Sequence, residues 1–168
     1  MKLTVKTPNM TQYFFQFEAS DELYHRCTWA EINLDHDNYT MSAASDCGNY
    51  TYGWHPTPAT ESFRKLMARL NKDYLLDKIS TERFDFEASK EALLKMVKDD
   101  GMEEGVILDV ELMDECGEEY FIIQAEELTN YGIESIPVIS EHPTAAKSFA
   151  IVFTKYLQPI LREELQKQ

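Results

Sequence analysis

Fourteen carboxylates stand together in the second half of this sequence, between Lys98 and Lys147, where there is no lysine or arginine. Carboxylates at this density can act as general acids or bases, bind a cation, or present negative charge to a basic partner. Pairs suited to acid–base chemistry occur throughout residues 99–127, so no single pair is marked as catalytic. The carboxylates are Asp99, Asp100, Glu103, Glu104, Asp109, Glu111, Asp114, Glu115, Glu118, Glu119, Glu126, Glu127, Glu134 and Glu141.

A calcium loop is not predicted within this acidic segment. The stretch from Asp109 to Glu115 lacks both the alternating oxygen ligands and the glycine at the sixth position that such a loop needs. Three interpretations remain open for the segment: a solvated face that keeps the protein soluble, a surface that binds a basic partner and, as the least favoured, a cation site of another kind. For the second, the predicted binding residues are Glu103, Glu104, Asp109, Glu111, Asp114, Glu115, Glu118 and Glu119.

Cysteines and histidines are the other residues that could bind a metal or act in catalysis. If His25 and Cys27 lie on one strand, they point to the same face and could join Cys47 and His55 in a zinc-binding tetrad. The spacing matches no zinc module, so we predict no metal site and no cofactor. His36 stands between two aspartates, which are expected to raise its pKa within a turn.

A cysteine nucleophile needs nearby positive charge to lower its pKa. Cys116 lies in the most acidic stretch, and Cys27 is expected to point away from its neighbour Arg26. The sequence also lacks the G-x-S-x-G, P-loop, G-x-G-x-x-G and H-E-x-x-H motifs. We therefore expect a protein that is not an enzyme, with a metal- or cysteine-dependent enzyme as the less favoured alternative.

The net charge of −14 belongs entirely to the acidic segment. The 168 residues contain 30 acidic and 16 basic side chains, and outside residues 99–146 the two signs balance. An acidic chain disfavours direct binding to nucleic acid or to an anionic membrane, and no apolar run approaches the ~18 residues of a membrane span. Three cysteines without paired spacing favour a reducing compartment, so a cytoplasmic protein is expected.

The elements that must position these residues begin with an antiparallel β-meander. Aromatic-rich and alternating segments, separated by turn residues, predict about five strands in residues 1–55. Gly48 is expected to supply a positive φ in the turn between the last two strands. The predicted strands fall at residues 3–5, 13–18, 25–34, 39–43 and 50–54.

Tyr50, Tyr52 and Trp54 alternate along the last of these strands and therefore share one face. That face is expected to cover the helix that follows it in sequence. The alternative is an exposed aromatic ledge, on which these three side chains bind a partner.

Beyond Pro56 and Pro58 the apolar period changes to that of helices. Helices are predicted over 63–79, over 87–97 and from Thr144 as N-cap, the last one interrupted near Lys155 by Pro159. In the acidic segment, residues 106–115 fit strand and helix equally, and 119–130 favour a helix. The predicted fold class is α+β, an N-terminal β-meander packed against C-terminal helices. We expect one compact domain over 1–168, with a sheet part at 1–55 and a mainly helical part at 60–168.

Three short stretches resemble a family of small proteins encoded by bacteriophages and prophages. They read SDCGNYTYGW at 45–54, FRKL at 63–66 and LNKDYLLDK at 70–78. The sequence departs from the family pattern at Cys47, where the family tends to have an aromatic residue. The family has no established reaction, so the resemblance implies a setting: phage accessory genes that act inside an infected cell.

Together, the resemblance and the acidic segment predict a non-enzymatic phage protein that binds and inhibits a host protein with a basic surface. The nucleic-acid channel of a CRISPR or restriction-type defence complex is such a surface, where carboxylates would stand in for phosphates. The alternative is a structural or assembly protein that self-associates, as a homodimer or larger oligomer, through its helices at 63–79 and 144–165.

Overall fold

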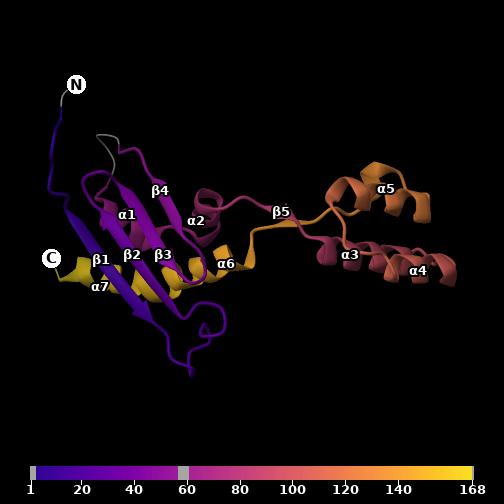
Figure 1. The fold of residues 1–168 in the computed structure, drawn as a ribbon, viewed down its shortest axis with the longest axis horizontal. Coiled ribbons are helices and arrows are strands. Elements are labelled where there is room, and N and C mark those ends of the chain that lie inside the picture. The colour runs from indigo at the N-terminus through magenta and orange to yellow at the C-terminus, as the bar shows by residue number, and fades with distance from the viewer. Residues whose placement is uncertain (1–2, 57–60, 168) are drawn as a thin grey trace. The chain divides into compact units, whose positions relative to one another are not determined.

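The computed structural model describes residues 3–56 and 61–167, which form two compact units (Figure 1). Unit 1 comprises Met1–Thr81 and His142–Gln168, and unit 2 comprises Glu82–Glu141. The break expected at Pro58 lies outside the described residues. The single domain expected over 1–168 stays a prediction. Unfolding measurements that follow each unit separately would test whether the two units unfold together.

Unit 1 contains a four-stranded antiparallel sheet in the order β1-β2-β3-β4, which confirms the N-terminal meander (Figure 1). The strands are β1 Met10–Gln16, β2 Trp29–Asp35, β3 Thr40–Ser45 and β4 Tyr50–Gly53. The sheet has four strands rather than about five, since residues 3–5 belong to no strand. Leu3 and Val5 are 80% and 85% exposed, so these alternating apolar side chains do not pack against a sheet.

The second strand begins later than the sequence pattern indicated. Cys27 lies ahead of β2 rather than on it, whereas the predicted strand began at His25. Ala30, Ile32 and Leu34 face the core of unit 1 in regular alternation. Trp29 consequently lies on the opposite, open face of the sheet.

Helices cover the other face of this sheet. The predicted helix over 63–79 is two helices, because the side chain of Asn71 accepts hydrogen bonds from the backbone N–H groups of Asp73 and Tyr74 and starts a new helix. Thr144 is the first helical residue after the N-cap Pro143, rather than the N-cap itself. The helical segments of unit 1 are α1 Phe63–Arg69, α2 Lys72–Ile79, α6 Thr144–Ile151, η2 Val152–Leu157 and α7 Gln158–Gln166.

The interruption predicted near Lys155 is confirmed, and it takes the form of the π-helical segment η2 between α6 and α7. Pro159 has no N–H to donate to the carbonyl of Lys155, so the regular helical pattern cannot continue there. The hydroxyl of Thr154 donates to the carbonyl of Ala150 at 2.7 Å, which adds a hydrogen bond at the start of the segment.

The core of unit 1 joins the sheet to these helices. Ile32, Leu34 and Met41 from the sheet are fully buried in one cluster with Phe149 and Phe153 from the C-terminal helices. The buried amide of Gln158 donates to the carbonyls at the end of α1, which fixes α7 against α1. This packing of a meander against helices confirms the α+β class.

Unit 2 is built from three α-helices, a short 3-10 helix and a small strand pair. Phe121 is fully buried and meets the rings of Phe84 and Phe86 at 5.5 and 5.9 Å. The chain over 106–115, which fitted both strand and helix, forms most of a helix that ends at Glu111. The elements are β5 Arg83–Phe84, α3 Phe86–Asp99, α4 Glu104–Glu111, α5 Glu118–Thr129, η1 Ile133–Ser135 and β6 Ser140–Glu141.

Both ends of unit 2 lie together. Strands β5 and β6 are antiparallel, and Arg83 pairs with Glu141 while Phe84 pairs with Ser140. Within unit 1, the flanking residues are also joined, because the hydroxyl of Ser80 hydrogen bonds to the ring of His142 at 2.9 Å.

Candidate protein-binding site

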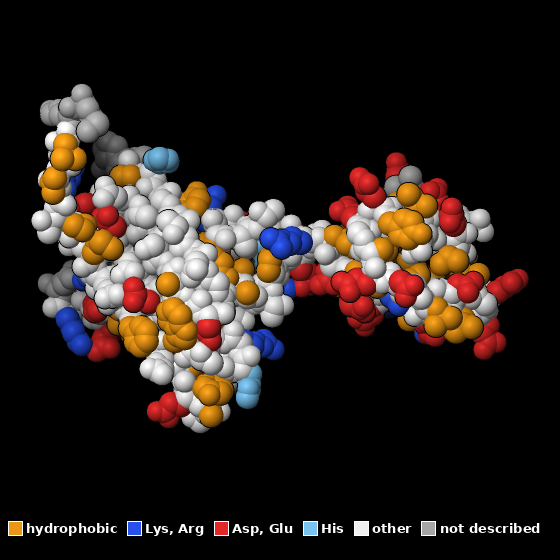
Figure 2. All heavy atoms as spheres, in the orientation of Figure 1, with side chains coloured by type: hydrophobic (Ala, Val, Ile, Leu, Met, Phe, Trp, Pro, Cys, Tyr) orange, Lys and Arg blue, Asp and Glu red, His pale blue; other side chains and the backbone are white. Residues whose placement is uncertain are grey.

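The charge of the molecule divides between the two units. Unit 2 has 18 acidic and four basic side chains and so carries the whole net charge of −14, whereas unit 1 has twelve of each sign. Figure 2 shows the acidic side chains gathered over the helices of unit 2, at the right of the view, with hydrophobic side chains between them. The acidic segment found in the sequence thus lies almost wholly within one structural unit.

The eight predicted binding residues are all exposed and all belong to unit 2. Four lie in or just before the first turns of α4 and α5, where the helix dipole favours negative charge. These are Glu103, Glu104, Glu118 and Glu119. The others lie on α4, as Asp109 and Glu111 do, or in the connection to α5, as Asp114 and Glu115 do.

An acidic hollow of about 380 Å³ lies between α4 and α5. It brings together two of the predicted residues, Asp109 and Asp114, and adds Glu127 from α5. Leu112 and Leu128 line the same hollow, so carboxylates and apolar surface meet there. A lysine or arginine side chain fits this combination, because its apolar stem and its charged end each find a matching surface. Met113 and Gln124 complete the lining.

Exposed apolar side chains accompany the carboxylates of unit 2. Leu108 and Leu112 lie one turn apart at α4 and are 52% and 68% exposed, and on α5 Tyr120 and Ile123 are exposed to a similar extent. Charged side chains alone would keep this surface soluble, and exposed apolar side chains do not improve solubility. Exposed apolar side chains are typical of a binding surface, because a partner buries them. The spacing of Leu108 and Leu112 could have indicated this surface if the chain there had been assigned as a helix.

Two of the four cations of unit 2 are held within the unit. The ammonium of Lys90 donates to the carbonyl of Met113 at 2.7 Å, and Lys98 pairs with Glu111 at 2.9 Å. Glu111 is therefore partly neutralised inside the unit. The other seven predicted carboxylates are therefore better candidates than Glu111 for contact with positive charge on a partner.

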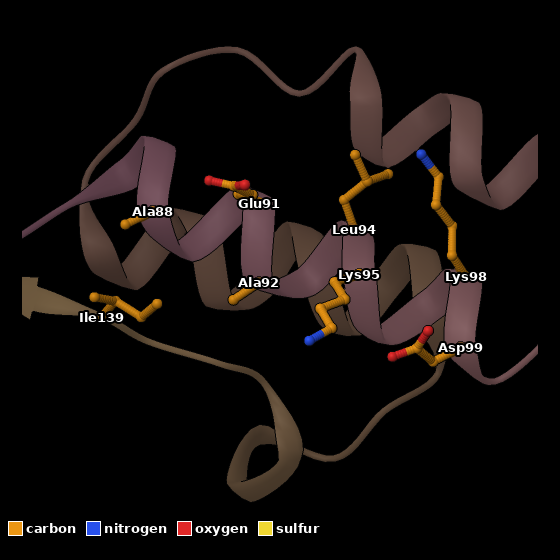
Figure 3. A pocket seen from close by; sticks show the side chains of 8 residues that line it. All are labelled: Ala88, Glu91, Ala92, Leu94, Lys95, Lys98, Asp99 and Ile139. Carbon is orange, nitrogen blue, oxygen red and sulfur yellow. The ribbon is translucent and has the colours of Figure 1, made fainter.

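A second hollow, of about 590 Å³, follows α3 (Figure 3). Lys95 and Lys98 stand beside Glu91 and Asp99 there, so its charge is mixed, and the small Ala92 leaves room along the helix. The acidic hollow between α4 and α5 is thus the better match for a basic partner. The lining residues of the α3 hollow are Ala88, Glu91, Ala92, Leu94, Lys95, Lys98, Asp99 and Ile139.

The predicted aromatic ledge lies largely in the core of unit 1. Trp54 is buried, with its ring 5.7 Å from that of Phe63, and the half-buried Tyr50 lies 4.6 Å from Phe149. Tyr52 is also half-buried and packs edge-on against Trp54. Packing against helices accounts for this face, and a binding role for the three side chains stays a prediction.

An exposed aromatic pair that the sequence reasoning missed lies on the open face of the sheet. The rings of Phe14 and Trp29 stack with centroids 6.4 Å apart, and the two side chains are 60% and 37% exposed. Phe14 stands between Tyr13 and Phe15, which face the core cluster. Alternation along this strand was the signal that could have identified Phe14.

Of the proposed zinc tetrad, the structure brings together only the two cysteines. The Sγ atoms of Cys27 and Cys47 lie 2.7 Å apart, whereas His25 and His55 are exposed and outside the cluster. Among residues 3–56 and 61–167, the cluster of potential metal ligands is completed by Asp46. Since β2 starts after Cys27, the expectation that His25 and Cys27 share a strand face was wrong.

The geometry of this cluster does not suit zinc. Two thiolates on a tetrahedral zinc, each about 2.3 Å from the metal, would be separated by roughly 3.7 Å. The carboxylate of Asp46 is already used, because it accepts hydrogen bonds from the backbone N–H groups of Thr28 and Trp29.

Two other titratable residues were considered from the sequence. Burial lowers the pKa of His36, and the charge of Arg64 lowers it further, so the expected rise was wrong. The pKa of Cys116 is raised by burial and by Asp114, as its acidic surroundings predicted. Neither residue has the environment of an activated catalytic group.

No helix among the described residues is long and apolar enough to span a bilayer.

In comparisons with known proteins, a family model named Phage_phiTE_072, described as a phage family, matches residues 5–163. The match runs through both units. No curated protein and no solved structure matches the chain.

Proposed function

Because this chain belongs to the phage protein family whose model matches residues 5–163, we propose that it is a non-enzymatic phage accessory protein that binds and inhibits a host protein. Binding takes place through the acidic surface of unit 2. The observation that carries the proposal is the segregation of charge, because the net charge is −14 on unit 2 and zero on unit 1.

Segregated charge has a cost that spread charge avoids. Carboxylates confined to 60 residues repel one another and destabilise the unit that holds them. Solubility alone would be served equally well by charge distributed over both units. A basic partner relieves the repulsion on binding, and the exposed Leu108, Leu112, Tyr120 and Ile123 supply apolar area to bury in the same interface.

The partner is a protein with a basic surface, such as the nucleic-acid channel of a CRISPR or restriction-type defence complex. There the carboxylates of unit 2 take the place of phosphates and so exclude the nucleic acid. The hollow formed by Asp109, Asp114 and Glu127 receives a lysine or arginine side chain, whose stem lies along Leu112 and Leu128.

Two variants of equal net charge test the proposal. The first changes the hollow (Asp109→Asn, Asp114→Asn, Glu127→Gln), and the second changes exposed acids of unit 1 (Glu18→Gln, Asp37→Asn, Asp73→Asn). Each is used to capture proteins from host lysate at low and at high salt, and the captured protein is then purified for affinity measurements.

We expect the hollow variant to lose about tenfold or more in affinity and the unit 1 variant to bind like the original protein. High salt should weaken binding by the original protein, because charge attraction is screened. Equal affinity for both variants, or indifference to salt, would overturn the proposal.

Light scattering of the purified protein addresses the alternative of an assembly protein. A large stable oligomer in the absence of any partner would favour self-association over inhibition of a host protein. A monomer that binds the captured host protein in a defined ratio is the expected result.

A further inference from the structure

Two buried thiols in unit 1 lie closer together than packing alone requires. The Sγ atoms of Cys27 and Cys47 are 2.7 Å apart, and both side chains are almost inaccessible to solvent. A disulfide bond is about 2 Å long, so less than 1 Å of approach separates this pair from a covalent bond.

The fold holds the two thiols in this position from both sides. In the β2–β3 pair, Ala30 lies opposite Ser45, so the chain before β2 runs beside the chain after β3. Asp46 ties the two segments together by accepting hydrogen bonds from the backbone of Thr28 and Trp29.

The turn after β3 fixes Cys47 itself. The hydroxyl of Tyr50 donates to the carbonyl of Cys47 at 2.7 Å, and the side chain of Ser45 lies 3.3 Å from its sulfur. Gly48 adopts a φ of +121° and has no Cβ, which leaves space for the ring of Tyr50 to lie across the turn. The thiol is consequently directed toward Cys27 rather than toward solvent.

We propose that Cys27 and Cys47 form an oxidisable dithiol, which closes to a disulfide when the protein reacts with a peroxide. This modification site is independent of the acidic surface of unit 2. The separation of 2.7 Å between the sulfur atoms is shorter than the roughly 3.7 Å expected for two ligands of one zinc ion.

The reaction has two steps. The Cys47 thiolate attacks one oxygen of hydrogen peroxide, the O–O bond breaks, and hydroxide leaves, so that Cys47 becomes a sulfenic acid. The sulfur of Cys27 then attacks the sulfur of Cys47, the S–O bond breaks, and the departing hydroxide takes the Cys27 proton as water. Overall, two thiols lose two electrons and two protons, and one peroxide is reduced to two waters.

The order of attack follows from the environments of the two sulfurs. The hydrogen bond between the two thiols, with a further contribution from Ser45, lowers the pKa of Cys47 to about 7. The pKa of Cys27 is raised by the same hydrogen bond and by burial. Cys47 also keeps 3% of its surface exposed, whereas Cys27 keeps none. Cys47 is thus the thiol that reacts with peroxide, and Cys27 is the one that resolves the intermediate.

The test uses the full chain, with Cys116 as an internal control. After brief treatment with hydrogen peroxide, the protein is quenched with acid, unfolded with an alkylating reagent and digested. Trypsin leaves Cys27 and Cys47 in a single peptide, residues 27–64, and further cleavage after Glu31 separates them unless a disulfide joins them.

We expect Cys27 and Cys47 to lose alkylation together, in a linked peptide that is two hydrogen atoms lighter, while Cys116 remains a thiol. Disulfide formation should raise the unfolding temperature of unit 1 by roughly 5 °C or more, because it closes the loop from 27 to 47 in the unfolded chain. A Cys116→Ser variant should behave identically, and Cys27→Ser or Cys47→Ser should abolish the shift.

Three results would overturn the proposal: oxidation of Cys116 while the pair stays reduced, Cys47 oxidised to sulfinic acid beside a free Cys27, or one zinc ion bound per chain that shields the pair. The peptide measurement on the unaltered protein decides the matter even if the serine variants fail to fold.

Discussion

The two units of this molecule differ in how much apolar burial offsets their charge. Among the described residues, the core cluster of unit 1 holds 23 buried apolar residues and that of unit 2 holds eight. Unit 1 is neutral, whereas unit 2, with the smaller core, carries the whole net charge. Small units are already the hardest to stabilise by burial. Unit 2 thus combines a strongly charged surface with a small apolar core.

The largest expected effect comes from removing one core ring in each unit. Phe121→Ala in unit 2 and Phe149→Ala in unit 1 each empty a fully buried site and should cost roughly 3–5 kcal/mol. Both tryptophans, Trp29 and Trp54, belong to unit 1. Tryptophan fluorescence therefore follows the unfolding of unit 1, and hydrogen exchange of α4 and α5 peptides follows unit 2.

If the units are independent, Phe121→Ala removes exchange protection in unit 2 and leaves the fluorescence transition in place. Phe149→Ala should do the reverse. Loss of both signals in either variant would instead establish the single cooperative domain that the sequence predicted for 1–168.

A pair of glycines with positive φ gives a smaller and more local comparison. Gly101 ends α3 with a φ of +68° and open space around it, so Gly101→Ala should cost only about 1 kcal/mol. At Gly48 an added Cβ would also collide with the ring of Tyr50. Gly48→Ala should therefore lower the free energy of unfolding by more than Gly101→Ala does. Denaturant unfolding of unit 1 measures the effect. Equal costs would show that Tyr50 moves away without penalty.

Salt should produce the smallest difference between the units. Screening acts over about 10 Å at 0.1 M ionic strength, so added sodium chloride should relieve repulsion among the carboxylates and stabilise unit 2. The neutral unit 1 provides the control, with little expected change in its fluorescence transition. Equal responses in exchange protection and fluorescence would mean that repulsion within unit 2 is negligible.

Much of the fold could be predicted because local patterns and tertiary packing agree. Strand alternation, the turn at Gly48 and the disruption caused by Pro159 each depend on neighbouring residues alone. The split at Asn71 could not be predicted from the apolar period, because a side-chain cap overrides a continuous stripe. Over α4, the valines and leucines fit both the two-residue period of a strand and the 3.6-residue period of a helix. Only packing against the rest of unit 2 selects the helix.

The candidate site was predictable in composition and not in arrangement. The absence of lysine and arginine between residues 98 and 147 identified the acidic surface directly. Glu127 and Leu128 join Asp109 in the hollow only because α5 folds beside α4, which no local pattern encodes. For the same reason the sequence offered Cys27 and Cys47 only as members of a disfavoured zinc tetrad and could not place their sulfur atoms in contact.

The pairing of β5 with β6 has a consequence for how such a chain can change. Unit 2 leaves and re-enters the rest of the sequence through adjacent residues, Arg83 and Glu141. Ser80 and His142, on the other side of the boundary, are joined as well. The acidic unit therefore has the layout of a domain insertion, in which a whole unit enters and leaves through one point of the host chain, so its removal would not require the sheet and helices of unit 1 to be rethreaded.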